Sequence, residues 1–258
     1  MRAKKSLGQN FLRDDAVVKR IVAALDLSED DTVVEIGPGQ GALTGDLLIT
    51  AGKVVAIEFD RDMVAILNER FAAIRNLELV NRDALSVDFS EVLGPNTDIK
   101  PKLVANLPYN ISTPILQRLI EQRELFSTIV LMFQREVAER ITATPGGKER
   151  GFLSVLVENA FETEYLFNVA PTAFTPVPKV WSAVVRLTPK SSGVPDEVLF
   201  RRIVSMSFAQ KRKTLSNNLK AFTTDAATVL TNAGINGIRR AETLTVNEWI
   251  KLTEQFSK

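Results

Sequence analysis

The feature that most constrains the fold is an alternation of short apolar runs with helical patterns through the first two-thirds of the chain. The alternation predicts βαβ units and a parallel sheet, with ligands bound at the carboxyl ends of its strands. The apolar runs, which predict buried strands, are 31–36, 53–58, 77–80, 102–105 and 128–133. The helical patterns between them lie at about 14–26, 42–51, 61–73 and 114–123.

The pattern changes near residue 165. Apolar runs at 165–169 and 183–187 flank a proline-rich connection too short for a crossover helix, which predicts an antiparallel hairpin at the sheet edge. Residues 189–195 have the composition of a linker, and only helical patterns follow it. The expected fold class is therefore α/β, a Rossmann-like sheet with an edge hairpin over 1–190, plus a small all-helical domain over 195–258.

Two absences from the composition narrow the chemistry. The chain has no cysteine and no histidine, which excludes disulfides, thiolate zinc sites, iron–sulfur clusters, cysteine nucleophiles and Ser-His-Asp triads. No metal site is expected. Carboxylate, lysine or tyrosine chemistry remains, or a reaction whose difficult step is carried by a cofactor.

Charge is balanced in sum but not in distribution. The formal net charge is +1, yet residues 1–13 and 201–224 carry basic side chains and no acid. Such stretches fit phosphate-binding patches, and solvated helix faces equally well. No signal peptide or membrane span is recognisable, so a cytoplasmic protein is expected. The basic residues are Arg2, Lys4, Lys5 and Arg13, then Arg201, Arg202, Lys211, Arg212, Lys213 and Lys220.

A glycine-rich turn follows the first predicted strand. Gly37, Gly39 and Gly41 let the backbone approach a ligand closely. With Ala42 the run also satisfies a dinucleotide fingerprint, so a nicotinamide oxidoreductase is an alternative. Glu58, 21 residues after Gly37, would hold ribose hydroxyls in either class.

Acids at the strand ends favour S-adenosylmethionine over a dinucleotide. Glu35 precedes the first glycine by two residues, where an oxidoreductase more often has an apolar side chain. Asp83, followed by Ala84, ends the third strand, where it is placed to accept from an adenine amino group or to cap a turn. Three acids ending successive strands around one glycine turn predict an S-adenosylmethionine pocket.

The fourth predicted strand ends in Asn106-Leu107-Pro108-Tyr109. Proline stiffens the turn, and the asparagine side chain and the Leu107 carbonyl offer two fixed acceptors. Two acceptors suit a planar exocyclic amine, and a base can stack on the tyrosine ring. A strand-ending turn with a core tyrosine is the alternative interpretation.

Residues 106–114, Asn-Leu-Pro-Tyr-Asn-Ile-Ser-Thr-Pro, resemble the signature of the ribosomal RNA adenine dimethyltransferases. Residues 6–12, 35–44 and 174–180 resemble further family motifs. The resemblance implies that Gln9, Asn10 and Leu12 border the methionine end of S-adenosylmethionine. It also implies that Glu58 and Asp83 bind its ribose and adenine, and that Phe174 and Tyr109 sandwich the target base.

The tail motifs at 210–215 and 240–242 resemble the housekeeping branch of the family. The resemblance implies dimethylation of two adjacent adenosines in a hairpin loop near the 3′ end of small-subunit rRNA, in an immature 30S-type particle. The helical domain would bind rRNA through Arg201, Arg202, Lys211, Arg212 and Lys213. Trp181 departs from the pattern, which has aspartate there. A monomer is the default expectation.

The implied mechanism is direct displacement. Asn106 and the Leu107 carbonyl hold the amine while it attacks the sulfonium methyl, and in-line positioning supplies most of the rate. No strong base is needed. Alternatives are an erythromycin-resistance enzyme acting on large-subunit rRNA, a non-catalytic assembly factor and a DNA amino-methyltransferase.

Overall fold

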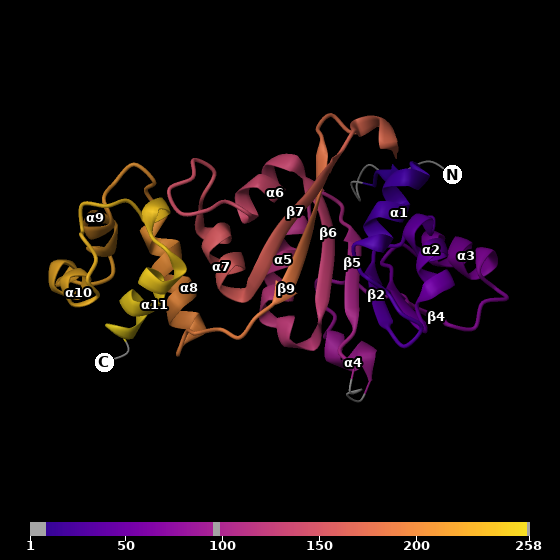
Figure 1. The fold of residues 1–258 in the computed structure, drawn as a ribbon, viewed down its shortest axis with the longest axis horizontal. Helices are drawn as coiled ribbons and strands as arrows, with labels where there is room; N and C mark the ends of the chain where they lie inside the picture. Colours follow the sequence, from indigo (N-terminus) through magenta and orange to yellow (C-terminus); the bar gives the residue numbers. More distant parts are fainter. Residues whose placement is uncertain (1–8, 95–98, 257–258) are drawn as a thin grey trace. The chain divides into compact units, whose positions relative to one another are not determined.

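Seven strands form one sheet in the computed structural model, which describes residues 9–94 and 99–256. The sheet order is β4-β3-β2-β5-β6-β9-β7 (Figure 1). Neighbours from β4 through β6 pair in parallel, and β9 pairs antiparallel with β6. The strands are β2 (Thr32–Ile36), β3 (Lys53–Ile57), β4 (Leu77–Val80), β5 (Lys102–Asn106), β6 (Thr128–Gln134), β7 (Phe161–Val169) and β9 (Ser182–Pro189).

The order of the strands changes side between β2 and β5, which are parallel neighbours. From β2 the chain proceeds through β3 to β4, then returns to place β5 on the other side of β2. Loops at such a switch point diverge and leave a crevice at the carboxyl ends of the two strands. The predicted glycine turn follows β2 and the predicted amine-holding turn follows β5, so the fold brings both to this crevice.

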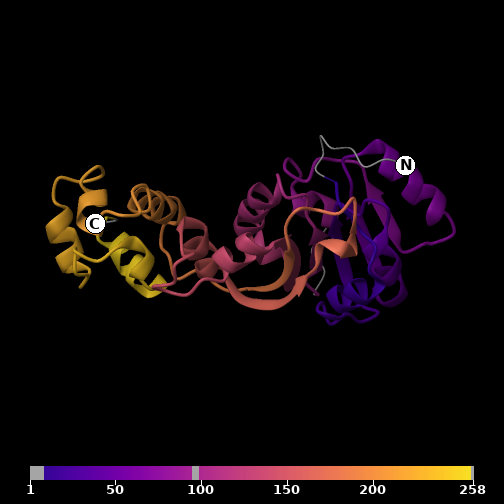
Figure 2. The ribbon, with the colours of Figure 1, turned by 90° about the horizontal axis from the view of Figure 1, so that it is seen from above.

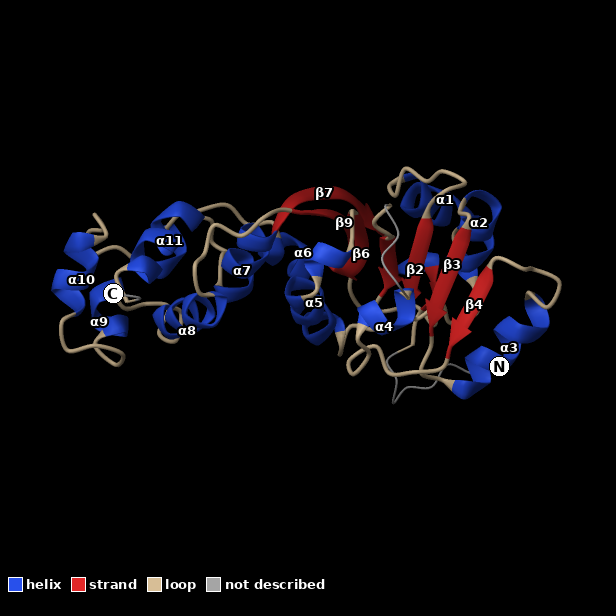
Figure 3. Cartoon of the chain, turned by 90° about the horizontal axis from the view of Figure 1, so that it is seen from below, coloured by secondary structure: helices blue, strands red, loops and turns tan. Residues whose placement is uncertain are grey.

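The central strands are buried on both faces. Val33 and Val34 point to opposite sides of β2, and both are fully buried. On one side, Val33 belongs to a core cluster with Ile21 of α1 and Leu47 of α2. Figure 3 shows helices on both sides of β2, β3 and β4. Coverage on both faces is typical of a parallel sheet and explains the continuous apolar runs.

Helices of the sheet unit begin at the residues that the sequence favours. Asp14 and Asp60 cap α1 and α3 by accepting from backbone N–H groups of the first turn. The predicted helices at 14–26 and 61–73 are confirmed, and each ends three residues earlier than predicted. The helices are α1 (Asp15–Ala23), α2 (Ala42–Thr50), α3 (Arg61–Arg70), α4 (Phe89–Leu93), α5 (Ser112–Glu121) and α6 (Arg135–Ile141).

The edge hairpin is confirmed, with β9 next to β6 and β7 outermost. A second sheet, which the sequence did not indicate, pairs β1 (Phe11–Leu12) antiparallel with β8 (Phe174–Thr175). Its register places Leu12 opposite Phe174. This short ladder joins the opening motif of the chain to the connection between β7 and β9.

Residues 139–161 and 190–258 form the second compact unit, and residues 1–138 and 162–189 form the first. Figure 2 shows the chain beyond residue 190, in orange and yellow, as helices and loops. The described residues beyond 195 contain no strand, as predicted. The helices are α7 (Phe152–Ala160), α8 (Glu197–Ser207), α9 (Leu215–Leu219), α10 (Ala226–Asn232) and α11 (Val246–Glu254).

The second unit includes residues 139–161, which the sequence assigned to the sheet domain. Arg150 has several contacts within this unit. Its guanidinium is fully buried and donates to the carbonyls of Ala143 at 2.8 Å and Leu244 at 3.0 Å. It also forms an ion pair with Glu158 at 2.6 Å. These contacts join the loop before α7 to the segment before α11, far apart in sequence.

Among the described residues, no helix is long and apolar enough to cross a membrane.

Candidate active site

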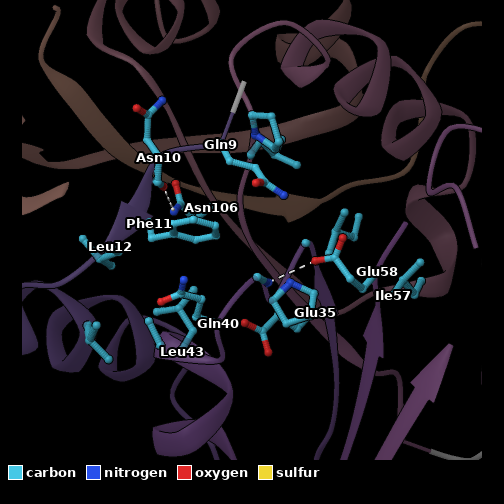
Figure 4. Close-up of a pocket in the computed structure, with 18 of the residues that line it drawn as sticks. Gln9, Asn10, Phe11, Leu12, Glu35, Gln40, Leu43, Ile57, Glu58 and Asn106 are labelled. Carbon is cyan, nitrogen blue, oxygen red and sulfur yellow. Dashed lines mark hydrogen bonds between the residues drawn. The ribbon is translucent and has the colours of Figure 1, made fainter. Parts of the chain in front are cut away.

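A cavity of about 460 Å³ lies at the carboxyl ends of β2, β3 and β5 in the sheet unit. Its walls come from the opening segment, the glycine loop, and the residues that follow β3, β4 and β5. Figure 4 shows the side chains of Gln9, Asn106, Glu35 and Glu58 around this space. The sequence-predicted cofactor residues that line it are Gln9, Asn10, Leu12, Glu35, Gly37, Gly39, Glu58, Asp83, Ala84 and Asn106.

Two glycines of the loop, Gly37 and Gly39, adopt left-handed backbone conformations beside the cavity. Gly37 has φ +67°, and its N–H donates to the Ile57 carbonyl at 2.9 Å. A Cβ placed on Gly37 would meet no protein atom within 4 Å. Because Gly37 lines the cavity, that space is open for a ligand in van der Waals contact with the backbone.

Gly41 was also predicted to bind the cofactor, and that role stays a prediction. Gly41 does not line the cavity but caps α2 with φ +80°. A Cβ there would lie 2.8 Å from a ring carbon of Phe71 and 3.0 Å from a methyl group of Leu67. Gly41 therefore permits close packing of the loop against α3.

Glu35 is buried beneath the glycine loop. The Thr44 hydroxyl donates to its Oε2 at 2.6 Å. Burial, with a smaller contribution from the nearby charge of Glu58, raises the pKa of Glu35 to about 7, although the hydrogen bonds from Thr44 oppose the increase. The group thus titrates near neutral pH, in the wall of the cavity.

Glu58 closes β3 with both carboxylate oxygens engaged. Its Oε2 accepts from the Gly39 N–H at 3.1 Å and its Oε1 from the Asp60 N–H at 2.8 Å. Each oxygen keeps a second acceptor position. Burial raises the pKa of Glu58, although these backbone donors oppose the increase. The carboxylate is therefore fixed in place with acceptor capacity for two neighbouring hydroxyl groups.

Asp83 lines the cavity and also caps a turn. Its Oδ1 accepts from the Leu85 N–H at 2.9 Å. The two interpretations that the sequence left open are compatible, because the other oxygen can accept a further bond.

The opening segment forms another wall. The Gln9 side chain donates to Asp60 at 3.1 Å, and Asn106 Nδ2 donates to the Asn10 carbonyl at 3.4 Å. Leu12 is buried in β1. Residues 6–8 of the predicted motif, and Arg2, Lys4 and Lys5 of the basic stretch, lie outside the described residues.

The turn after β5 reaches the same cavity. Asn106, Leu107, Pro108 and Tyr109 all line it. The Tyr109 hydroxyl lies 2.7 Å from the hydroxyl of Ser182, which is fully buried at the start of β9. Burial raises the pKa of Tyr109, so its phenol stays protonated at neutral pH. The contact with Ser182 therefore fixes the hydroxyl end of the Tyr109 ring.

Phe174 does not line the cavity. Its side chain is only 2 % exposed and belongs to the core cluster, where pairing of β8 with β1 holds its backbone. The structure thus does not bring Phe174 and Tyr109 to one space. The sandwich role of Phe174 stays a prediction that requires its side chain to leave the core.

The predicted RNA-binding residues lie in the second unit, on α8 and the turn before α9. Arg202 is exposed with its guanidinium 4.8 Å from the centre of the Phe222 ring. Lys211 donates to the Lys148 carbonyl at 3.4 Å. Arg212 and Lys213 are exposed and Arg201 is half-buried.

Comparison with known proteins identifies the family. The model of the family described as ribosomal RNA adenine dimethylase matches residues 1–258. The chain belongs to this family. Methyl transfer from S-adenosylmethionine to adenine of rRNA is accordingly its reaction, which confirms the resemblance, the enzyme class and the cofactor predicted from the sequence.

Relatives cover nearly the whole chain. Ribosomal RNA small subunit methyltransferase A of Geobacter sulfurreducens is 45 % identical over 98 % of this chain and 95 % of its own length. The protein of the same name from Pseudomonas fluorescens is 42 % identical over 99 % and 94 %.

Two similar solved structures confirm the predicted fold class. A dimethyladenosine transferase from Plasmodium falciparum superposes with a TM-score of 0.81 at 29 % identity, covering 96 % of this chain and 97 % of that one. The 23S rRNA methyltransferase ErmE gives a TM-score of 0.72 at 26 % identity, covering 96 % and 100 %.

Several residues that line the cavity or hold its side chains were not predicted. Phe59, directly after Glu58, lines the cavity and is 61 % exposed. Thr44 and Ser182 position Glu35 and Tyr109 through their hydroxyl groups. The sequence did offer a signal for Phe59, because it directly follows Glu58, the residue expected to bind the ribose. Ser182 gave none, because its contact with Tyr109 spans 73 residues.

Proposed function

We propose that this protein dimethylates two adjacent adenosines in a hairpin loop near the 3′ end of small-subunit rRNA, as a cytoplasmic monomer acting on an immature 30S-type particle. The observation that carries the proposal is the convergence of the glycine loop and the Asn106–Tyr109 turn on one cavity. The names of relatives at 42–45 % identity support the small subunit as the target.

The cavity fits S-adenosylmethionine in three respects. The open space at Gly37 accommodates a ligand against the backbone, the fixed Glu58 carboxylate can accept from two ribose hydroxyls, and Asp83 can accept from an adenine amine. Gln9, Asn10 and Leu12 would border the methionine end. When bound, S-adenosylmethionine supplies an electrophilic methyl group on a sulfonium.

The turn after β5 holds the adenine amine. The Asn106 side-chain oxygen and the Leu107 carbonyl accept its two N–H groups, which directs the nitrogen lone pair away from both acceptors. Pro108 restricts the turn, so the acceptors keep their positions. A proton released from the amine passes to water, in keeping with the absence of histidine from the chain. In-line positioning carries most of the rate acceleration.

Tyr109 provides the face on which the flipped adenine stacks, and each such stack contributes about 1–3 kcal/mol. The hydrogen bond to Ser182 orients this ring before the base arrives. Phe174 becomes the second face when its side chain turns out of the core. A monomethylated amine must fit the same space for the second transfer.

Basic side chains of the second unit bind rRNA phosphates in this proposal. Reversing the charge of Arg212 and Lys213, both exposed, should weaken RNA binding. It should also reduce the salt dependence by roughly one unit of slope per lost contact. An unchanged slope would remove these residues from the interface.

The proposal is tested with labelled S-adenosylmethionine and three ribosomal particles: small subunits that lack the modification, mature small subunits and large subunits. Label confined to the unmodified small subunits supports it. Label in large subunits would instead assign the chain the activity named for ErmE. An all-deoxy copy of the target hairpin, if methylated, would indicate a DNA methyltransferase.

A further inference from the structure

The loop between β8 and β9 exposes three large apolar side chains. Val177, Val180 and Trp181 are 63 %, 41 % and 47 % exposed. Trp181 contrasts with Trp249, the other tryptophan of the chain, which is fully buried. A half-exposed indole with apolar neighbours forms a surface on which a flat partner can stack.

This loop is attached to the wall of the cavity. The Trp181 carbonyl accepts at 2.9 Å from the N–H of Arg135, which directly follows β6. The next residue, Ser182, is paired with Gln134 in the sheet and holds the Tyr109 hydroxyl. Because neighbouring side chains of an extended segment point to opposite sides, Ser182 faces inward to Tyr109 and Trp181 faces solvent. Trp181 thus has a fixed position one residue from the partner of Tyr109.

Charge around the loop favours an anionic partner. The sequence has no acid from residue 165 to residue 195, and Lys179 is exposed between Val177 and Trp181. The adjacent helix α6 begins with both signs, Arg135 and Glu136, so the cationic character belongs to the loop. An aromatic face beside a cation suits single-stranded nucleic acid, in which bases stack and phosphates carry the charge.

We propose that Trp181 binds, by stacking, a nucleotide that flanks the target adenosine in a single-stranded segment of rRNA. This rests on the proposed function, because a target base in contact with Tyr109 brings its neighbours to the loop. A purely apolar protein partner is disfavoured, since it would leave Lys179 within the interface without an acid of this loop to pair with.

Intrinsic fluorescence tests the contact directly. The full chain is titrated with a short unstructured RNA of mixed sequence, with excitation at the red edge of the indole band to avoid RNA absorption. Stacking on Trp181 should reduce tryptophan emission by up to about half, because only one of the two tryptophans is exposed. Trp181→Phe should abolish the quenching.

Methyl transfer to unmodified small subunits gives a second measurement. Trp181→Ala should raise KM for the subunit about 5- to 10-fold, the lower part of the range for one base stack. We expect kcat within about two-fold of wild type and an unchanged KM for S-adenosylmethionine, while Trp181→Phe stays close to wild type because a ring remains. Ile49→Ala is the matched control, since Ile49 is 81 % exposed on α2 in the same unit; it should change nothing.

Absence of quenching in the wild type, or equal KM values for Trp181→Ala and Ile49→Ala, would overturn the proposal. Quenching by RNA-free ribosomal proteins but not by RNA would also overturn it and indicate a protein partner. Failure of the wild type to methylate any particle contradicts the proposed function instead. The quenching titration distinguishes the two failures because it requires no transfer.

Discussion

Replacing Gly37 by alanine should affect stability and S-adenosylmethionine binding through two separate causes, backbone strain and lost ligand space. Gly37 has φ +67°, and the added methyl group would meet no protein atom within 4 Å. The folded state therefore loses only the free energy of a left-handed alanine, about 1–2 kcal/mol. For a chain of this size, that corresponds to a decrease in Tm of about 2–8 °C.

The methyl group would stand in the cavity that we assign to S-adenosylmethionine. Overfilling a well-packed site by one methyl group costs about 1–3 kcal/mol, which corresponds to a Kd about 5- to 150-fold higher. Gly234→Ala is the matched control, because Gly234 has φ +72°, has nothing within 4 Å of its added Cβ and lies in the second unit. It should show a similar loss of Tm.

The assay is isothermal titration of each variant with S-adenosylmethionine, beside thermal unfolding without ligand. We expect similar Tm decreases in both variants and weaker binding in Gly37→Ala alone. Equal affinity of the two variants for S-adenosylmethionine would show that the ligand does not occupy the space at Gly37.

Three further predictions concern single side chains. Glu35 binds more protons folded than unfolded between its ordinary pKa of 4.5 and about 7, so stability should decrease as pH rises through this window. Thermal unfolding at pH 5 and pH 8 should therefore show wild type losing up to about 3 kcal/mol relative to Glu35→Gln, and parallel curves would contradict this. Tyr109→Phe removes the hydrogen bond to the buried Ser182 hydroxyl and should lower the free energy of unfolding by about 1 kcal/mol. Tyr109→Ala also removes the ring and should lower kcat/KM by up to about 150-fold. Similar kcat/KM values in the two variants would argue against stacking. Phe174→Ala should destabilise the fold by about 3–5 kcal/mol as a core truncation, and Phe174→Leu, which fills most of that space, tests the stacking role: transfer at the wild-type rate would leave Phe174 a core residue only.

The parts of the fold that could be predicted are those encoded locally. The strands β2, β3 and β5 are mostly apolar on both faces because both faces are buried, so each contains a short run of consecutive apolar residues. The helices of the sheet unit could be predicted because their apolar residues recur at helical spacing. Glu58 could be placed because a strand end, a glycine turn and a fixed separation in sequence define its position.

What could not be predicted depends on distant contacts. Phe174 is buried because β8 pairs with β1, more than 160 residues away in the chain. Gly41 lies so close to Phe71, at the end of α3, that an added Cβ would be 2.8 Å from its ring. Arg150 is charged, and the residues next to it in the sequence do not indicate that it is buried. Its guanidinium is buried because it donates to the carbonyls of Ala143 and Leu244.

In the proposed function, the turn after β5 holds the amine that becomes methylated. The most direct measurement is nucleoside mass spectrometry of unmodified small subunits after incubation with wild type or Asn106→Ala, with binding to the subunit measured on the same samples. We predict dimethyladenosine with wild type, and with Asn106→Ala undiminished binding and no dimethyladenosine. Dimethyladenosine formed by Asn106→Ala at the wild-type rate would contradict the proposed role of this turn.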